Sequence, residues 1–196
     1  MEERYLELKQ AGEVLRGGGV IMHPTETCYG LAADIFNRKA LQKLYAIKKM
    51  KADKPVSIMV RSLAEARKYA RFNKTALSLA NKFWPGPLTL ILPRKKSLPA
   101  FLNKGHKTVG IRCPDSTVSL ALIKVNGGPL TTTSANISGK PEVYSVMAFL
   151  KQVKMGDVQP DYIMDQGKIP PNKPSTIVEI SSEGVKVIRK GDLFLG

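Results

Sequence analysis

The chain has 196 residues, of which 43% are hydrophobic and 24% are charged, a composition typical of a folded protein and not of a disordered one. No apolar run is long enough to cross a bilayer, and the mixed-charge start, MEER, does not resemble a signal peptide, so we expect a cytoplasmic protein without a membrane partner. Thirty-one Lys and Arg against sixteen Asp and Glu give a net charge of +15, which favours a polyanionic partner such as a nucleotide or tRNA; a Lys-rich surface that serves only solubility is the alternative.

Short strands and helices alternate through the first half of the chain. Asn37 suits the N-cap of a helix, Ser62 suits another, and the two prolines and the glycine that follow Trp84 stop a third. From periodicity we expect helices over 3–16, 38–47, 63–69 and 74–83, and strands over 20–22, 25–33, 56–60 and 88–92.

The second half continues the same mixture. We expect helices over 98–102, 118–125 and 142–154, and strands over 108–113, from 130 onward, over 162–164, and over 175–180 and 185–189, with a hairpin turn at Glu183 and Gly184. No internal repeat and no long linker divides the chain. The irregular order of elements therefore predicts one α/β domain over residues 1–196, built on a mixed sheet.

The segment 130–139 (LTTTSANISG) changes from strand-forming to turn-forming residues within a few positions. Its hydroxyl and carboxamide groups are suited to phosphate or carboxylate oxygens. A polar surface turn is the alternative.

Two cationic features are further candidates for anion binding. The loop 48–54 carries several lysines directly before a strand, and it could clamp phosphates or form a solvated helix end. Arg112 lies between apolar neighbours near the end of a strand, where it could form a structural salt bridge or bind an anionic ligand.

No pattern of His, Cys and carboxylates predicts a protein nucleophile or a metal cage. Cys28 and Cys113 are far apart and are expected to be reduced, partly buried thiols. His23 and His106 are expected to be structural or exposed.

Six segments in register make the chain resemble the YrdC/YciO family. They are 24–31 (PTETCYGL), 84–89 (WPGPLT), 110–115 (GIRCPD), 129–139 (PLTTTSANISG), 174–178 (PSTIV) and 188–191 (IRKG). The resemblance implies an open, twisted mixed β-sheet flanked by helices, with a deep basic cavity, in the shorter form of the family.

The resemblance also implies an activity, that of a nucleotidyltransferase which condenses L-threonine, bicarbonate and ATP, with Mg2+ on the nucleotide. The products are threonylcarbamoyl-AMP and pyrophosphate, and further proteins transfer the threonylcarbamoyl group to tRNA. The positions matching the family's ATP contacts are Lys48, Lys54, Thr108, Ser134, Asn136 and Arg189. Those matching its threonine contacts are Thr27, Arg112, Thr132 and Ser175.

The chain departs from the family pattern at two positions. Synthases carry Lys-x-Arg in the basic loop, and an ungapped comparison places Met50 at the Arg, whereas a slip of one residue places Lys51 there. Many synthases have a His where this chain has Met59. These departures and the high positive charge leave a second hypothesis open, a non-catalytic, YciO-like protein that binds nucleotides, tRNA or double-stranded RNA.

Overall fold

The computed structural model describes residues 2–51, 53–181 and 184–194, and these form a mixed β-sheet with helices around it. The helices are α1 (Glu2–Arg16), α2 (Arg38–Ile47), α3 (Leu63–Tyr69), α4 (Lys74–Phe83), α5 (Thr117–Asn126) and α6 (Val146–Leu150). The strands are β1 (Val20–His23), β2 (Gly30–Ala33), β3 (Ser57–Met59), β4 (Leu88–Pro93), β5 (Thr108–Arg112), β6 (Leu130–Ser134), β7 (Tyr162–Ile163), β8 (Thr176–Ser181) and β9 (Gly184–Arg189).

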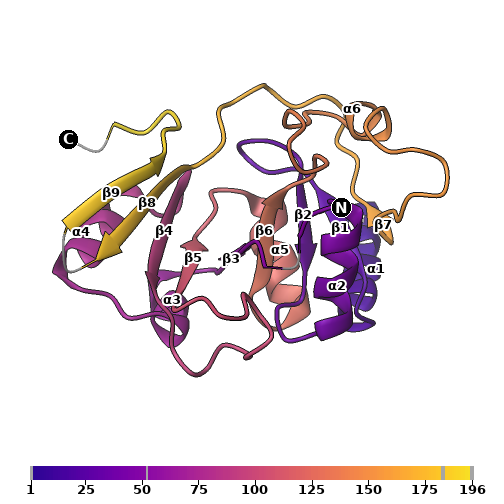
Figure 1. The fold of residues 1–196 in the computed structure, drawn as a ribbon. Coiled ribbons are helices and arrows are strands. Elements are labelled where there is room, and N and C mark those ends of the chain that lie inside the picture. Colours follow the sequence, from indigo (N-terminus) through magenta and orange to yellow (C-terminus); the bar gives the residue numbers. More distant parts are fainter. Residues whose placement is uncertain (1, 52, 182–183, 195–196) are drawn as a thin grey trace.

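The strands form one open sheet in the order β7-β1-β2-β6-β3-β5-β4-β8-β9 (Figure 1). Three neighbouring pairs are parallel, namely β1 with β7, β3 with β5 and β4 with β8, and the other pairs are antiparallel. The predicted α/β class with a mixed sheet is therefore confirmed. Strand β6 lies between β2 and β3, so the segment that follows β6 lies beside loops that are distant from it in the sequence.

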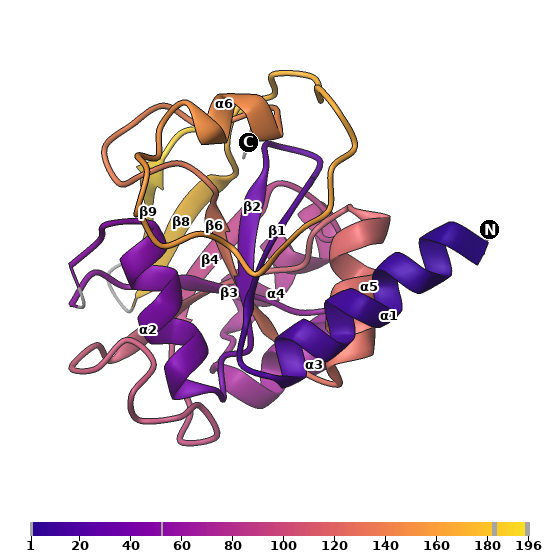
Figure 2. The ribbon, with the colours of Figure 1, turned by 90° about the vertical axis from the view of Figure 1, so that its right-hand side faces the viewer.

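The two faces of the sheet bury different clusters of apolar residues, because successive side chains of a strand point to opposite faces. Leu31, Ile58 and Ile111 belong to a large cluster that includes residues of α2, α3 and α4. The alternate positions, among them Met59 and Leu130, belong to a smaller cluster with residues of α1 and α5. Figure 2 shows α1 and α5 together on one side of the sheet and α2 on the other.

The smaller cluster covers only part of its face. Ser57 lies two residues before Met59, and Thr132 lies two residues after Leu130, so both point to the same face as that cluster. These two side chains are polar, and they line a pocket instead of packing under α1 and α5. A change from apolar to polar side chains along β3 and β6 therefore marks where the core ends and the pocket begins.

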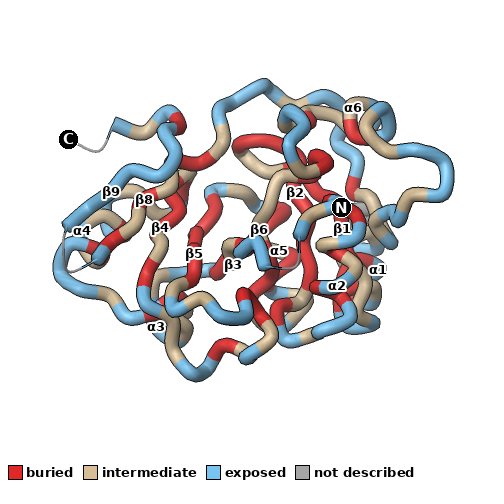
Figure 3. The backbone as a smooth tube through the Cα atoms, viewed as in Figure 1, coloured by how far each residue is buried: buried red, intermediate tan, exposed pale blue. Residues whose placement is uncertain are grey.

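The edge strand β9 is exposed along its whole length, in contrast to the buried central strands (Figure 3). It pairs with β8 from Ser181 and Gly184 onward, with an irregularity between Ile177 and Val178. The predicted hairpin turn includes Glu183, which lies outside the described residues. Within the described part of the chain, no helix has the length and apolar character needed to span a membrane.

Most predicted elements are confirmed, including the caps. The side chain of Asn37 accepts from the N–H groups of Lys39 and Ala40, and Ser62 accepts from Glu65. Each cap satisfies backbone donors that a helix N-terminus leaves without an intrahelical partner.

The predicted strand over 25–33 is wrong in its first half, because β2 begins only at Gly30. The hydroxyl of Thr25 accepts from the N–H groups of Thr27 and Cys28 and donates to the carbonyl of Cys28 at 2.7 Å. This local bonding closes a turn and competes with strand pairing.

Two predicted helices are also wrong in extent or kind. Residues 98–102 form turns, and the Arg94 guanidinium donates to the carbonyls of Pro99 and Leu102 at 2.9 and 2.7 Å. The helix predicted over 142–154 is only α6, because the carbonyls of Val143 and Tyr144 accept from Tyr29 and Ile169 instead of from a helical turn.

We predict that Asn103→Ala destabilises the protein by about 2–4 kcal/mol. The buried carboxamide of Asn103 accepts from the Val56 N–H and donates to the Val56 carbonyl, both at 2.9 Å, and its backbone is left-handed at φ 49°. Alanine removes both bonds and tolerates that backbone less well than asparagine. Urea unfolding measures the loss, with the exposed Lys104→Ala as a control. A loss equal to that of the control would contradict the prediction.

Candidate functional site

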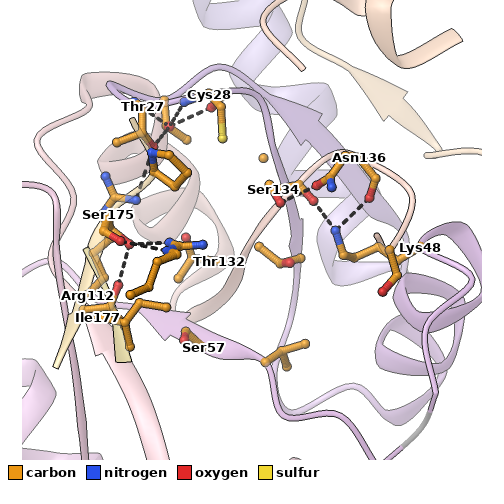
Figure 4. A pocket seen from close by; sticks show the side chains of 18 of the residues that line it. Thr27, Cys28, Lys48, Ser57, Arg112, Thr132, Ser134, Asn136, Ser175 and Ile177 are labelled. Carbon is orange, nitrogen blue, oxygen red and sulfur yellow. Dashed lines mark hydrogen bonds between the residues drawn. The ribbon is translucent and has the colours of Figure 1, made fainter. Parts of the chain in front are cut away.

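The pocket has a volume of about 280 Å³ and lies where β6 gives way to its loop. It is lined by nine of the ten residues that the family resemblance implied, namely Thr27, Lys48, Lys54, Arg112, Thr132, Ser134, Asn136, Ser175 and Arg189. Four of these are Lys or Arg, and none of the described residues that line the pocket is Asp or Glu. Figure 4 shows Lys48, Ser134 and Asn136 on one side of the pocket and Arg112, Ser175 and Thr27 on the other.

Thr108 is the residue that the structure does not bring to this pocket. It begins β5 opposite Pro93, whereas Arg112 ends the same strand. At about 3.3 Å per residue, the two ends of β5 are roughly 13 Å apart. The nucleotide contact of Thr108 stays a prediction.

The loop after β6 is held in shape by its own side chains. The Ser134 hydroxyl donates to the Asn136 carboxamide oxygen, and the Asn136 amide donates to the carbonyls of Lys140 and, at 3.2 Å, of Ile137. The Ala135 N–H donates to the Tyr29 carbonyl at 2.8 Å. These bonds hold the loop through the protein's own groups, and a loop held in this way costs less conformational entropy when a ligand binds.

Lys48 fastens this loop to the end of α2. Its ammonium group, in a side chain that is 4% exposed, donates to the carbonyls of Ser134 and, at 2.8 Å, of Asn136. The carbonyl of Lys48 in turn accepts from the Ser138 N–H at 2.8 Å. The pKa of Lys48 is lowered to about 8, chiefly by burial and also by the charge of Lys54, although the Cys28 and Glu142 side chains act in the opposite direction.

In the rest of the basic loop 48–54, some residues line the pocket and others lie on the surface. Lys54 and Met50 line the pocket, and the Lys54 ammonium lies 3.4 Å from the Ser138 hydroxyl. Lys49 forms an ion pair with Asp157 at 2.8 Å, and Lys51 is exposed. Met50 therefore faces the pocket at the position where the ungapped comparison expects an Arg.

Arg112 forms the structural salt bridge that the sequence left open, and it also lines the pocket. Its Nη2 donates to Glu26 Oε1 at 2.7 Å, its Nε lies 3.3 Å from the Gly86 carbonyl, and its Nη1 lies 3.4 Å from the Thr27 hydroxyl. The residue is 5% exposed. The two interpretations of Arg112 are therefore compatible with each other.

Arg189 lies on the same side of the pocket as Arg112. Its Nε donates to the Ser175 carbonyl at 3.0 Å and its Nη2 to the Ser175 hydroxyl at 3.1 Å. The Ser175 and Thr89 hydroxyls are 2.9 Å apart and form a further hydrogen bond. Arg189 was expected to contact the nucleotide, and the structure places it beside a residue expected to contact the amino acid.

Several pocket residues were not expected from the sequence, among them Cys28, Ser57 and Thr89. Ser57 pairs with Thr132 and Thr89 with Arg112, so the strand registers place each on the same face as an expected site residue. Burial raises the pKa of the Cys28 thiol to about 11, so it is protonated at neutral pH. His23 is buried, and burial lowers its pKa to about 4. Among the described residues there is no group of three or more His, Cys, Asp and Glu that could hold a metal ion.

A family model described as "Telomere recombination", for Sua5, YciO and YrdC, matches residues 13–191. A putative threonylcarbamoyl-AMP synthase of Methanocaldococcus jannaschii is 40% identical over 97% of this chain and 88% of its own length. The threonylcarbamoyl-AMP synthase of Pyrococcus abyssi is 32% identical over 96% of this chain and 55% of its own length, so this chain spans about half of that relative.

Solved structures give the same result for the fold. The structure of P. abyssi Sua5 complexed with L-threonine has a TM-score of 0.86 at 32% identity, and covers 95% of this chain and 54% of that one. The structure of E. coli YciO has a TM-score of 0.83 at 28% identity, and covers 96% of this chain and 90% of that one. The open mixed sheet with its flanking helices is thus shared with both.

We predict that the difference in unfolding free energy between the wild type and Lys48→Met moves in favour of the wild type as the pH rises from about 8 to 10.5. Burial lowers the pKa of Lys48 from 10.5 to about 8, so in this window the unfolded chain holds a proton that the folded chain has lost. Stability rises with pH wherever the unfolded state binds more protons. Urea unfolding of both proteins at pH 7.0 and at pH 9.5 measures the change, and a pH-independent difference would contradict it.

Proposed function

The chain belongs to the Sua5/YciO/YrdC family, and from that premise we propose that it is a nucleotidyltransferase that makes threonylcarbamoyl-AMP and pyrophosphate from L-threonine, bicarbonate and ATP. The observation that carries the proposal is one pocket with Arg112 on one side and Lys48 on the other. Lys54 also lines this pocket, and its ammonium lies beside the Ser138 hydroxyl of the loop after β6. One side suits the carboxylate of an amino acid, and the other suits a polyphosphate.

The reaction needs positioning more than it needs a protein nucleophile. The amino group of L-threonine and bicarbonate give a carbamate and water, and a carbamate oxygen then attacks the α-phosphorus of ATP. The bond from that phosphorus to the bridging oxygen breaks, and pyrophosphate leaves. Holding both reactants together and neutralising the charge around the α-phosphate supply the acceleration.

The amino-acid side consists of Thr27, Arg112, Thr132 and Ser175. Arg112 is the group suited to the α-carboxylate, because a guanidinium offers several N–H donors in one plane. The hydroxyls of Thr27 and Ser175 lie close to the two arginines, and Thr132 lies on the sheet between the two sides of the pocket.

The nucleotide side consists of Lys48, Lys54, Ser134 and Asn136. Lys54 is the cation of this side whose ammonium has the fewest contacts with the protein, so it is suited to reach phosphate oxygens. Lys48 adds positive charge while it holds the loop of Ser134 and Asn136. Arg189 lies beside Ser175 on the amino-acid side. From there it would contact the α-phosphate, where the reaction takes place, rather than the base or the γ-phosphate.

We assign Mg2+ to the substrate, as the counter-ion of the ATP phosphates. Protein sites for Mg2+ normally offer one or two carboxylates, and the described pocket lining has none. The tRNA, and the proteins that would transfer the threonylcarbamoyl group to it, follow from the family's role, and the net charge of +15 is compatible with an RNA partner.

The alternative of a non-catalytic nucleotide- or RNA-binding protein is less well supported. Its arguments were the net charge of +15, Met50 and Met59. Of these, Met59 belongs to the core cluster under α1 and α5 rather than to the pocket lining. Synthases of several organisms are also among the relatives at 30–40% identity.

The direct test is release of pyrophosphate from ATP, measured with and without L-threonine and bicarbonate, with the adenylate detected by mass spectrometry. We predict pyrophosphate release that requires both co-substrates, and a loss of roughly tenfold or more for Asn136→Ala, whose carboxamide shapes the nucleotide loop. Threonine-independent release, or none at all, would contradict the proposed function.

We further predict that Met50→Arg lowers the KM for ATP by roughly threefold to tenfold, because a guanidinium at this lining position adds a charge-assisted contact to phosphate. Lys51→Arg is the matched control, since Lys51 is exposed and takes the Arg position only in the slipped comparison. An effect of Lys51→Arg without one of Met50→Arg would show that the slipped comparison is the right one.

A further inference from the structure

We propose that Glu26, which does not itself line the pocket, is a positioning residue that orients the guanidinium of Arg112 and moderates its charge towards a substrate carboxylate. The inference rests on the proposed function, in which Arg112 binds the α-carboxylate of L-threonine. It adds a residue whose role is exerted through another side chain.

The contacts of Arg112 fix the plane of its guanidinium and hold Nη1 least tightly. Glu26 Oε1 accepts from Nη2 at 2.7 Å, and the Gly86 carbonyl lies 3.3 Å from Nε. The contact of Nη1 with the Thr27 hydroxyl is long, at 3.4 Å. A guanidinium carries five N–H donors, so the donors of Nη1 are those best placed for a ligand in the pocket.

Glu26 is itself held from several directions. Its Oε1 also accepts from the Asp115 N–H at 2.8 Å, and its backbone carbonyl accepts from the Asn172 amide at 2.9 Å. It lies within the turn that the Thr25 hydroxyl closes by accepting from the N–H groups of Thr27 and Cys28. A carboxylate fixed in this way can determine the orientation of a longer side chain.

Because the ion pair between Arg112 and Glu26 is largely buried, Glu26 weakens the attraction of Arg112 for another anion. The Arg112 side chain is 6% exposed and that of Glu26 is 20% exposed, so water screens the pair only weakly. Glu26 already offsets the positive charge of the Arg112 guanidinium, so a substrate carboxylate would be the second anion beside it. Arg112 should therefore hold a carboxylate more loosely than an uncompensated buried arginine would.

A moderate affinity of Arg112 for the α-carboxylate suits the proposed reaction, because threonylcarbamoyl-AMP keeps this group of L-threonine. Arg112 would contact this group equally in substrate and product, and uniform binding of this kind does not speed the chemical step. A tighter contact would instead slow the release of the product. Glu26 thus provides orientation without excessive affinity.

The two effects of Glu26 can be separated because its other oxygen, Oε2, is buried and has no hydrogen-bond partner among the residues that the structure describes. In Glu26→Gln the amide oxygen can take over both contacts of Oε1, with Arg112 and with the Asp115 N–H, and only the negative charge is lost. In Glu26→Ala both the contacts and the charge are lost. The pair of variants therefore separates orientation from charge.

The test measures the dissociation constants of L-threonine and of an ATP analogue by calorimetry, together with kcat and KM for both substrates, in the wild type and in both variants. Glu65→Gln is the matched control, because Glu65 also pairs with an arginine, Arg61, outside the pocket. Thermal unfolding of each variant establishes that it is folded.

For Glu26→Gln we expect L-threonine to bind with equal or higher affinity and kcat to be unchanged or lower. For Glu26→Ala we expect the affinity for L-threonine to fall by roughly tenfold or more, because the guanidinium is no longer held. The affinity for the ATP analogue should stay within about twofold of the wild type in both, as in Glu65→Gln.

Weaker threonine binding by folded Glu26→Gln, or equal losses for threonine and the ATP analogue, would overturn the inference and leave the proposed function standing. If Glu26→Ala does not fold, the result for Glu26→Gln alone decides between these outcomes. A wild type that binds no L-threonine would instead overturn the proposed function, and the inference with it.

Discussion

Two cationic side chains are buried beside the pocket, Lys48 at 4% exposure and Arg112 at 5%, and a folded chain tolerates a buried charge only where it supplies oxygen atoms to it. The two are compensated differently. Arg112 faces the carboxylate of Glu26 at 2.7 Å, whereas the Lys48 ammonium donates to the neutral backbone carbonyls of Ser134 and Asn136. Lys48 and Lys54 therefore keep their positive charge, whereas much of the charge of Arg112 is offset by Glu26, and the neighbouring Arg189 bonds to Ser175. In the proposed function, the polyanionic phosphate chain would bind at Lys48 and Lys54, and the singly charged carboxylate would bind at Arg112.

The hydrogen bonds of the Lys48 ammonium also connect the pocket to the central strands of the sheet. The carbonyls that receive the Lys48 ammonium belong to the end of β6 and its loop, and β6 lies between β2 and β3. The central strands thus bring together α2, the turn after Pro24 and the segment after β6, although these segments are far apart in the sequence. Along β3 and β6, apolar side chains under α1 and α5 give way to hydroxyls at Ser57 and Thr132. The pocket lies where this change occurs, because the helices cover only the apolar part of the sheet face.

The sequence predicted most helices, strands and caps, because they depend on local periodicity and on single residues such as Asn37. It failed where a tertiary contact competes with a local preference, as in the helix expected over 142–154, whose first carbonyls bond to Tyr29 and Ile169. The pocket residues were placed through resemblance to a family, and nine of ten line one cavity. Glu26 could not be found in this way, because its contact with Arg112 spans 86 residues of sequence and only the fold brings the two together.

In the proposed function, one pocket binds an amino acid and a nucleotide at the same time, each on its own side. The most direct measurement is an amide NMR titration of the isotopically labelled protein with L-threonine, with a non-hydrolysable ATP analogue, and with both. We expect L-threonine to shift the signals of Thr27, Arg112 and Ser175, and the analogue to shift those of residues 134–139. Both sets of shifts should persist when both ligands are present. Competition between the two ligands, or threonine-induced shifts centred on residues 134–139, would contradict this expectation.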